Sequence, residues 1–159
     1  MAVRDGRIDY LASDHSPAPP ALKQCDTGNL AQAWGGIASL QLTLPIVWTM
    51  ARRQPDVSLV DLVRWLARRP ARLVGLERRK GALAAGYDAD LVVFDPNAEF
   101  TVSLSSLHHR HKMTPYDGQT LWGRVHKTVL RGQTVFNAGR FADTPSGRPL
   151  LRTPARATG

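Results

Sequence analysis

Apolar positions in the first half of the chain repeat with helical spacing. The clearest helix follows Ser58, and its apolar side consists of Leu59, Leu62, Val63 and Leu66. Ser58 can cap the free backbone N–H groups of this helix, and Asp61 complements its dipole. Pro70 lacks an N–H and is predicted to end or kink the helix, and a short second helix is predicted over residues 70–75. An earlier helix is expected over residues 37–53, after a loop that contains Gly35-Gly36.

Short apolar runs bounded by turn residues predict strands. Residues 8–13 form one such run before Asp14-His15-Ser16-Pro17, so a brief buried strand is expected to deliver polar side chains into a loop. Three further runs, at residues 90–95, 124–130 and 134–136, predict a strand and then a hairpin with its turn at residues 131–133. Helices therefore come first and strands second, with a seam near residues 76–82. Residues 103–120 read as an extended loop.

Composition limits the classes of protein that fit. The chain has 159 residues, 43% of them hydrophobic and 21% charged, which suits one soluble globular domain. No run reaches the ~18 apolar residues of a membrane helix, and the N-terminus lacks the apolar core of a secretion signal. Cys25 is the only cysteine, so nothing requires an oxidising compartment. A cytoplasmic location and no membrane partner are expected.

A net charge of +8 raises the question of nucleic-acid binding. Part of the excess is a stripe of arginines at helical spacing, Arg64, Arg68 and Arg72. Such a stripe is usually a solvated helix face, and no helix-turn-helix or similar frame accompanies it. Nucleic acid is therefore not the expected partner, and a basic nucleic-acid binder remains an alternative.

The strongest chemical feature is Asp14-His15 at the end of the first predicted strand. Barrels of the α/β class place catalytic groups and metal ligands at strand carboxyl ends, although an aspartate there is more often a turn former. The histidines of the 103–120 loop, His108, His109 and His111, lack accompanying carboxylates or cysteines and are interpreted as surface or packing residues.

Several segments resemble allantoinases, which are cyclic amidohydrolases of the dihydroorotase and hydantoinase superfamily. The matching stretches are Ala12-Ser13-Asp14-His15-Ser16-Pro17 with Leu22-Lys23 after it, Trp34-Gly35-Gly36-Ile37, Arg69-Pro70-Ala71-Arg72, Gly86-Tyr87-Asp88-Ala89-Asp90, and His111-Lys112 with Thr114-Pro115-Tyr116. Their order and spacing cover roughly residues 5–142. The resemblance implies an α/β fold: the C-terminal fragment of a (β/α)8 metal-dependent hydrolase barrel, followed by part of a small β-sandwich. Residues 1–76 would be the last barrel strand and helices, 77–142 the sandwich part, and 143–159 a flexible tail.

The resemblance also implies a reaction and a set of site residues. Allantoinases hydrolyse the hydantoin ring amide of allantoin to allantoate at a two-metal centre, usually zinc. By this resemblance Asp14 would be a metal ligand and the catalytic proton shuttle. His15, Ser16 and backbone groups near Gly35 would contact the small-molecule substrate.

Two departures from the family pattern refine this hypothesis. Dihydroorotases usually carry a histidine where this chain has Ala18, and hydantoinases continue the glycine loop to an acidic residue, which is absent here, so allantoinase fits best. The other zinc ligands of the family have no counterpart before Asp14. The chain is therefore expected to be a C-terminal fragment, with Met1 an internal or misassigned start, and to be inactive by itself.

Some alternatives remain open. The chain could be a hydantoinase, dihydropyrimidinase or dihydroorotase fragment, or a short binding protein without catalysis. Association into homo-oligomers is suggested only by analogy with the relatives.

Overall fold

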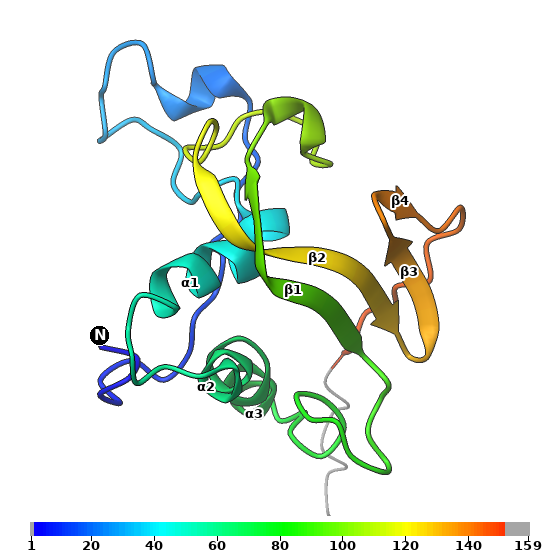
Figure 1. Ribbon diagram of the computed structural model, residues 1–159. Coiled ribbons are helices and arrows are strands. Elements are labelled where there is room, and N and C mark those ends of the chain that lie inside the picture. The colour runs from blue at the N-terminus through cyan, green and yellow to red at the C-terminus, as the bar shows by residue number, and fades with distance from the viewer. Residues whose placement is uncertain (1, 152–159) are drawn as a thin grey trace, which may run out of the picture.

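The computed structural model describes residues 2–151, which form a helical part and an antiparallel sheet (Figure 1). The helices are α1 (Thr43–Ala51), α2 (Leu59–Val63), a π-helical turn (Arg64–Arg68) and α3 (Arg69–Leu73). Short 3₁₀ turns lie at Pro20–Lys23, Leu40–Leu42 and Leu104–Ser106. The strands are β1 (Leu91–Thr101), β2 (Thr120–Leu130), β3 (Gln133–Asn137) and β4 (Arg140–Phe141).

The four strands are antiparallel neighbours in the order β1-β2-β3-β4. The β2–β3 hairpin closes through Arg131 and Gly132, whose φ angles of +48° and +80° are those of a two-residue type I′ turn. Asp90 holds this turn, because its carboxylate accepts a hydrogen bond from the backbone N–H of Arg131 at 2.9 Å. The strands predicted at residues 90–95, 124–130 and 134–136 and the hairpin between the last two are confirmed. Strand β1 runs further than predicted, since register shifts between Val93 and Phe94 and between Asp95 and Glu99 accommodate Pro96.

The helix that follows Ser58 begins as predicted. The Ser58 hydroxyl accepts a hydrogen bond from the backbone N–H of Asp61 at 3.3 Å, and the Asp61 carboxylate accepts one from the N–H of Ser58 at 3.0 Å. Together these two bonds form a reciprocal capping box. The hydrogen bond from the Ser58 hydroxyl also lowers the pKa of Asp61 below its ordinary value.

The helix does not end at Pro70, because helical structure runs on through α3, and the kink at Pro70 stays a prediction. A π-helical turn precedes Pro70, and in it the N–H of Arg69 bonds to the carbonyl of Arg64, five residues back. The carbonyl of Trp65 is thereby left for another donor and accepts the N–H of Leu11 at 3.1 Å. Gly75, predicted as the C-cap, ends the helical stretch one residue later: Val74 is the C-cap, and Gly75 follows it with a left-handed φ of +72°.

The helix predicted over residues 37–53 is shorter than expected. Residues 40–42 form a 3₁₀ turn and the α-helix starts only at Thr43. Pro45 gives the physical reason, because a residue without an N–H is accommodated in the first turn of a helix and not in its interior.

The strand predicted over residues 8–13 is absent. This segment has no ladder partner among the described residues, and regular pairing is limited to one parallel bridge between His15 and Ile37. An apolar run becomes a strand only where a neighbouring strand supplies hydrogen bonds.

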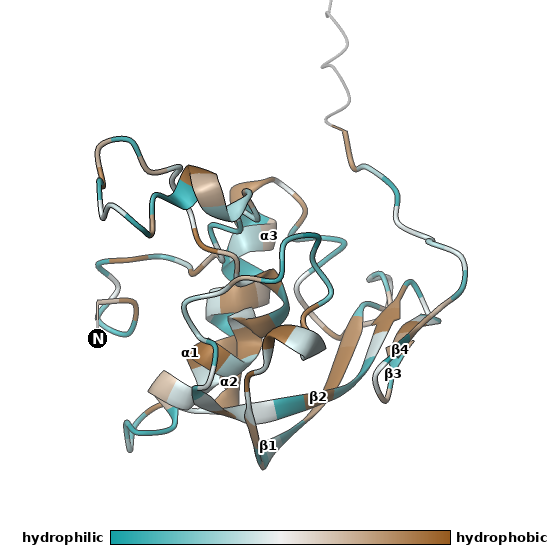
Figure 2. Ribbon diagram, turned by 90° about the horizontal axis from the view of Figure 1, so that it is seen from above, coloured by the Kyte–Doolittle hydropathy of each residue, from teal (hydrophilic) through white to brown (hydrophobic). Residues whose placement is uncertain are grey.

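The helical part packs on β1 and β2, with α1 crossing one side of these strands (Figures 1 and 2). Leu42 shares a buried cluster with Val102, Leu107 and Leu121. The indole N–H of Trp48 donates to the carbonyl of Pro96 at 2.8 Å, across the same interface. The architecture is therefore α/β with an antiparallel sheet, in which α1 and the 3₁₀ turn before it share a core with the sheet. The seam at residues 76–82 stays a prediction.

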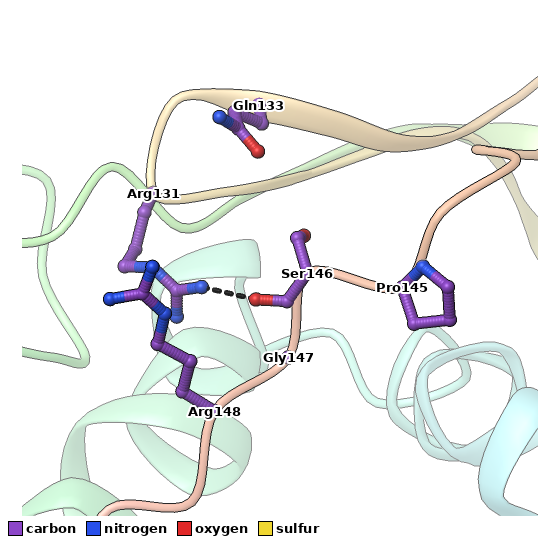
Figure 3. A pocket seen from close by; sticks show the side chains of 6 residues that line it. All are labelled: Arg131, Gln133, Pro145, Ser146, Gly147 and Arg148. Carbon is purple, nitrogen blue, oxygen red and sulfur yellow. Dashed lines mark hydrogen bonds between the residues drawn. The ribbon is translucent and has the colours of Figure 1, made fainter.

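No helix of residues 2–151 is long and apolar enough to cross a membrane. The predicted tail, residues 143–159, extends beyond the described residues after Leu151. Within it, the carbonyl of Ser146 accepts a hydrogen bond from the guanidinium of Arg131 (Figure 3).

Candidate functional site

Asp14 occupies a backbone conformation that few aspartates adopt. Its φ of +47° lies in the left-handed region, which is unfavourable for residues other than glycine and is often found at functional sites. Two hydrogen bonds to Ile37 hold the chain directly after this residue: the carbonyl of Asp14 accepts the N–H of Ile37 at 2.8 Å, and the N–H of Ser16 donates to the carbonyl of Ile37 at 3.0 Å. The residue itself is exposed. The main chain is thus fixed while the carboxylate remains accessible.

Gly36 allows this close approach of two loops. A Cβ atom at position 36 would lie 2.5 Å from the Cβ of Ser16 and 2.7 Å from the carbonyl oxygen of Asp14, and the φ of Gly36 is +78°. Both the contact and the conformation require glycine. Gly35 has neither restriction, since nothing lies within 4 Å of a Cβ built there.

His15 caps the helical segment that follows the glycine loop. Its Nδ1 accepts hydrogen bonds from the backbone N–H groups of Ser39 at 3.2 Å and Leu40 at 3.1 Å. These are free donors at the start of the 3₁₀ turn that leads into α1. An Nδ1 that accepts carries no proton, so the neutral ring has its proton on Nε2. Burial lowers the pKa of His15 below its ordinary value, and the nearby His109 lowers it further.

A second bond fixes the same junction: the hydroxyl of Ser39 donates to the carbonyl of Ser13 at 3.0 Å. Ser39 is buried, with only 4% of its surface exposed. The segment that carries Asp14 is therefore held on both sides of the aspartate by the start of the helical segment.

His109 also reaches this site. Its ring lies edge-on to that of His15, with centroids 5.6 Å apart and planes inclined by 67°, and its Nε2 is 3.2 Å from the carbonyl of Met113. The sequence analysis gave the loop histidines only surface or packing roles and did not predict that one of them would meet His15. The structure brings His109 there because the 103–120 loop folds back over residues 39–42. The side chain of Gln41 bonds to two backbone groups of that loop, at Ser106 and His108.

Lys23 is a residue of the site to which the sequence reasoning gave no role. Its ammonium donates to three successive carbonyls of the glycine loop, those of Trp34 at 3.1 Å, Gly35 at 3.0 Å and Gly36 at 2.8 Å. The N–H of Trp34 also donates to the carbonyl of Leu22 at 2.8 Å. Only the resemblance, which includes Leu22-Lys23, pointed to this position.

The structure thus brings Asp14, His15 and Ser16 together with the Gly35-Gly36 loop. Their assigned roles in metal and substrate binding stay predictions. Among the described residues, no group of three or more histidine, cysteine, aspartate or glutamate side chains could hold a metal ion. His108 lies apart from the site, with its ring centroid 4.7 Å from that of Phe141.

Two cavities lie elsewhere in the described chain and contain none of these residues. One of about 250 Å³ lies between the hairpin turn and residues 145–148 (Figure 3). The other is bordered by Arg68, Arg72, Glu77, Arg78, Lys80, Ala82 and Tyr87.

The sequence pattern of the amidohydrolase family matches residues 23–136. The chain belongs to the amidohydrolase family. This amidohydrolase chain is 50% identical over 154 residues to the allantoinase of Streptomyces avermitilis, covering 97% of the chain and 33% of that protein. It is 46% identical over 151 residues to the allantoinase of Saccharomyces cerevisiae, covering 94% of the chain and 32% of that protein. The chain spans about a third of the length of these curated relatives.

Solved hydantoinases share the fold of this amidohydrolase chain. The L-hydantoinase (dihydropyrimidinase) of Arthrobacter aurescens superposes with a TM-score of 0.80 at 32% identity, covering 89% of the chain and 31% of that enzyme. A Thermus D-hydantoinase superposes with a TM-score of 0.79 at 28% identity, with the same coverage of both chains. The sequence comparisons confirm the resemblance to allantoinases. The fold of the chain matches that of about a third of each of these solved hydantoinases.

Proposed function

We propose that this chain is the C-terminal part of an allantoinase-like, metal-dependent cyclic amidohydrolase, which hydrolyses the hydantoin ring amide of allantoin to allantoate. The observation that carries the proposal is the conformation and exposure of Asp14 in its loop. An exposed carboxylate stands on a fixed, left-handed backbone between two loops that both match the allantoinase pattern. Identity of 50% to an allantoinase along 97% of the chain favours this substrate over other cyclic amides.

Within this proposal, residues 1–76 contribute the last strand and helices of a (β/α)8 barrel, residues 77–142 contribute part of a β-sandwich, and residues 143–159 form a tail. The parallel bridge between His15 and Ile37 is consistent with a barrel edge, because barrel strands are parallel. Exposed apolar side chains on α2, namely Leu59, Val60 and Val63, fit a helix that packs against further barrel elements.

Asp14 would act as a metal ligand and as the proton shuttle of the reaction. Ring opening requires a base that takes the proton of the attacking water and returns it to the departing ring nitrogen. The carboxylate of Asp14 has no hydrogen-bond partner among the described residues, and hydrogen bonds fix its main chain. It can therefore serve both the attacking water and the departing ring nitrogen.

His15, Ser16 and Gly35 would border the substrate. Nδ1 of His15 is engaged by the start of the helical segment, so its Nε2–H is the group left to donate to a ring carbonyl. The N–H of Gly35 has no acceptor in the described part of the chain and is available to a substrate oxygen.

The described residues of this chain do not complete the expected two-zinc centre. Asp14 fits one ligand position, but a structural zinc ion takes four protein ligands and a catalytic one about three. The described residues offer no cluster of three. We therefore expect the isolated 159-residue chain not to turn over allantoin.

A chimera tests the proposed function. In it, this chain replaces the matching third of the Streptomyces avermitilis allantoinase, the relative to which it is 50% identical. We expect the chimera to convert allantoin to allantoate and to prefer allantoin over unsubstituted hydantoin. Asp14→Asn should lower kcat by two or more orders of magnitude, because an amide can neither accept the proton nor replace a carboxylate ligand.

Asp26→Asn is the matched control, because Asp26 is also an exposed aspartate in a loop of the same region. A folded chimera that hydrolyses hydantoin but not allantoin would assign the chain to a hydantoinase instead. Full activity of the Asp14→Asn chimera would contradict the role of Asp14.

A further inference from the structure

We propose that Lys23 is a positioning residue that turns the peptide N–H groups of Gly35 and Gly36 toward the Asp14 side of the loop, where they face the substrate. The identity of that substrate rests on the proposed function. The geometry of the loop comes from hydrogen bonds between described residues.

The ammonium of Lys23 uses all of its donors on this loop. A lysine ammonium has three N–H bonds, and they match three successive carbonyls, those of Trp34, Gly35 and Gly36, at 2.8–3.1 Å. A surface lysine without a structural role would keep its ammonium in water. Here the ammonium instead fixes the orientation of three consecutive peptide planes.

That orientation decides where the amide groups of the loop point. In a trans peptide the C=O and the following N–H point in opposite directions, and no cis peptide occurs in the described chain. Carbonyls that converge on Lys23 therefore direct the N–H groups of Gly35, Gly36 and Ile37 away from it. The Ile37 N–H shows what lies on that side, because it donates to the carbonyl of Asp14 at 2.8 Å.

Two of the three N–H groups are left without an acceptor. The described residues offer no hydrogen-bond acceptor to the N–H of Gly35 or of Gly36, whereas Ile37 has one. The three peptide units have the positive ends of their dipoles on the side of the loop away from Lys23, where the Ile37 N–H meets Asp14. Such an array suits a carbonyl or imide oxygen of a cyclic amide.

The site also explains why the lysine has to hold the loop. Backbone hydrogen bonds hold the loop at Trp34 and Ile37, whereas a Cβ at Gly35 would meet nothing within 4 Å, so packing does not fix the peptides between them. Lys23 comes from the 3₁₀ turn Pro20–Lys23, which follows the Asp14 segment in sequence. Its ammonium thus links this turn to the backbone of the glycine loop.

The first test uses the 15N-labelled 159-residue chain with Lys23→Met, Lys23→Arg and the control Lys127→Met. Lys127 lies on β2, and its side chain forms no hydrogen bond or ion pair in the described chain. We expect Lys23→Met to shift the Gly35 and Gly36 amide signals and to accelerate hydrogen exchange at Ile37 by tenfold or more. The hairpin amides of β2 and β3 should keep their exchange rates, and Lys23→Arg should restore part of the effect.

The second test separates positioning from a purely structural contact. In the allantoinase chimera, Lys23→Met should reduce kcat/KM for allantoin on the order of 10- to 100-fold at a temperature where the protein is fully folded, as expected for loosened site geometry. Most of the change should appear in KM, because the N–H groups of the loop bind the ring before and during the reaction. Lys127→Met should leave both constants unchanged.

The outcomes distinguish the two proposals. Unchanged exchange and chemical shifts at residues 35–37 in Lys23→Met would overturn the role of Lys23. Altered exchange with an unchanged kcat/KM would also overturn it, because Lys23 would then hold the loop without serving the substrate. A folded wild-type chimera without allantoinase activity contradicts the proposed function, and the exchange experiment on the chain still decides whether Lys23 orients the loop.

Discussion

The imidazole of His15 accepts a hydrogen bond from the backbone N–H of Ser39, at 3.2 Å and across 24 positions of sequence. The residue after the candidate catalytic aspartate thus serves as the cap of the helical segment that leads into α1. Helix caps are usually short polar side chains adjacent in sequence, so a distant histidine in this role ties two separate segments together. The position of Asp14 therefore depends on how the helical segment begins.

Loss of this cap should weaken the fold. We expect His15→Ala to lower the free energy of unfolding by about 1 kcal/mol, as for removal of other N-cap side chains, because two backbone donors lose their acceptor. Urea denaturation measures the change. His126→Ala is the control, since His126 is an exposed residue of β2, and equal stability of the two variants would contradict the capping role.

A methyl group at position 36 should separate the two loops of the site. Gly36→Ala places a Cβ 2.5 Å from the Cβ of Ser16 in a conformation with a φ of +78°. We expect a loss of stability of about 1–2 kcal/mol or more, because the conformation alone costs that much for an L residue. Thermal unfolding compares this variant with Gly35→Ala, which meets nothing within 4 Å and should melt close to wild type.

The indole of Trp48 should connect α1 to β1 through a hydrogen bond as well as through packing. Trp48→Phe removes the donor to the carbonyl of Pro96 but keeps an aromatic ring, so a loss of about 1 kcal/mol is expected. Trp34→Phe, at a position that is 60% exposed, serves as the control in the same denaturation series. A Trp48→Phe protein as stable as the control would show that the hydrogen bond contributes nothing.

Acid should weaken the junction between the helical part and the sheet. The ammonium of Lys80 lies 3.0 Å from the carboxylate of Asp88, and this hydrogen bond lowers the pKa of Asp88 below its ordinary value of 3.8. A lowered pKa means that the unfolded chain takes up the proton first as the pH falls. The stabilisation is therefore complete well above pH 3.8 and is lost as the pH falls below that value.

Denaturation at several pH values measures this dependence. Asp88→Asn should flatten the stability profile between neutral pH and about pH 3, whereas Asp26→Asn should leave its shape as in wild type. Identical profiles for wild type and Asp88→Asn would rule out the contribution of this ion pair.

Local chemistry fixed the features that the sequence predicted correctly. The cap at Ser58, the end of the helical stretch at Gly75 and the turn at Arg131-Gly132 each depend on residues a few positions apart. Such interactions form wherever the chain leads, so pattern and propensity are enough to predict them. The resemblance to allantoinases likewise depends on short motifs in order, and the sequence comparisons confirm it.

Tertiary structure decided the remainder. Residues 8–13 carry a strand pattern but form none, because a strand needs a paired neighbour. The helical stretch continues through Pro70 because a π-helical turn shifts the hydrogen bonding, and the freed carbonyl of Trp65 finds the N–H of Leu11, 54 positions earlier. The approach of His109 to His15 and the three bonds of Lys23 likewise join segments far apart in sequence. The sequence by itself determined which residues have side chains suited to binding or proton transfer. Only packing determined which of them meet, because contacts between distant segments depend on the path of the whole chain.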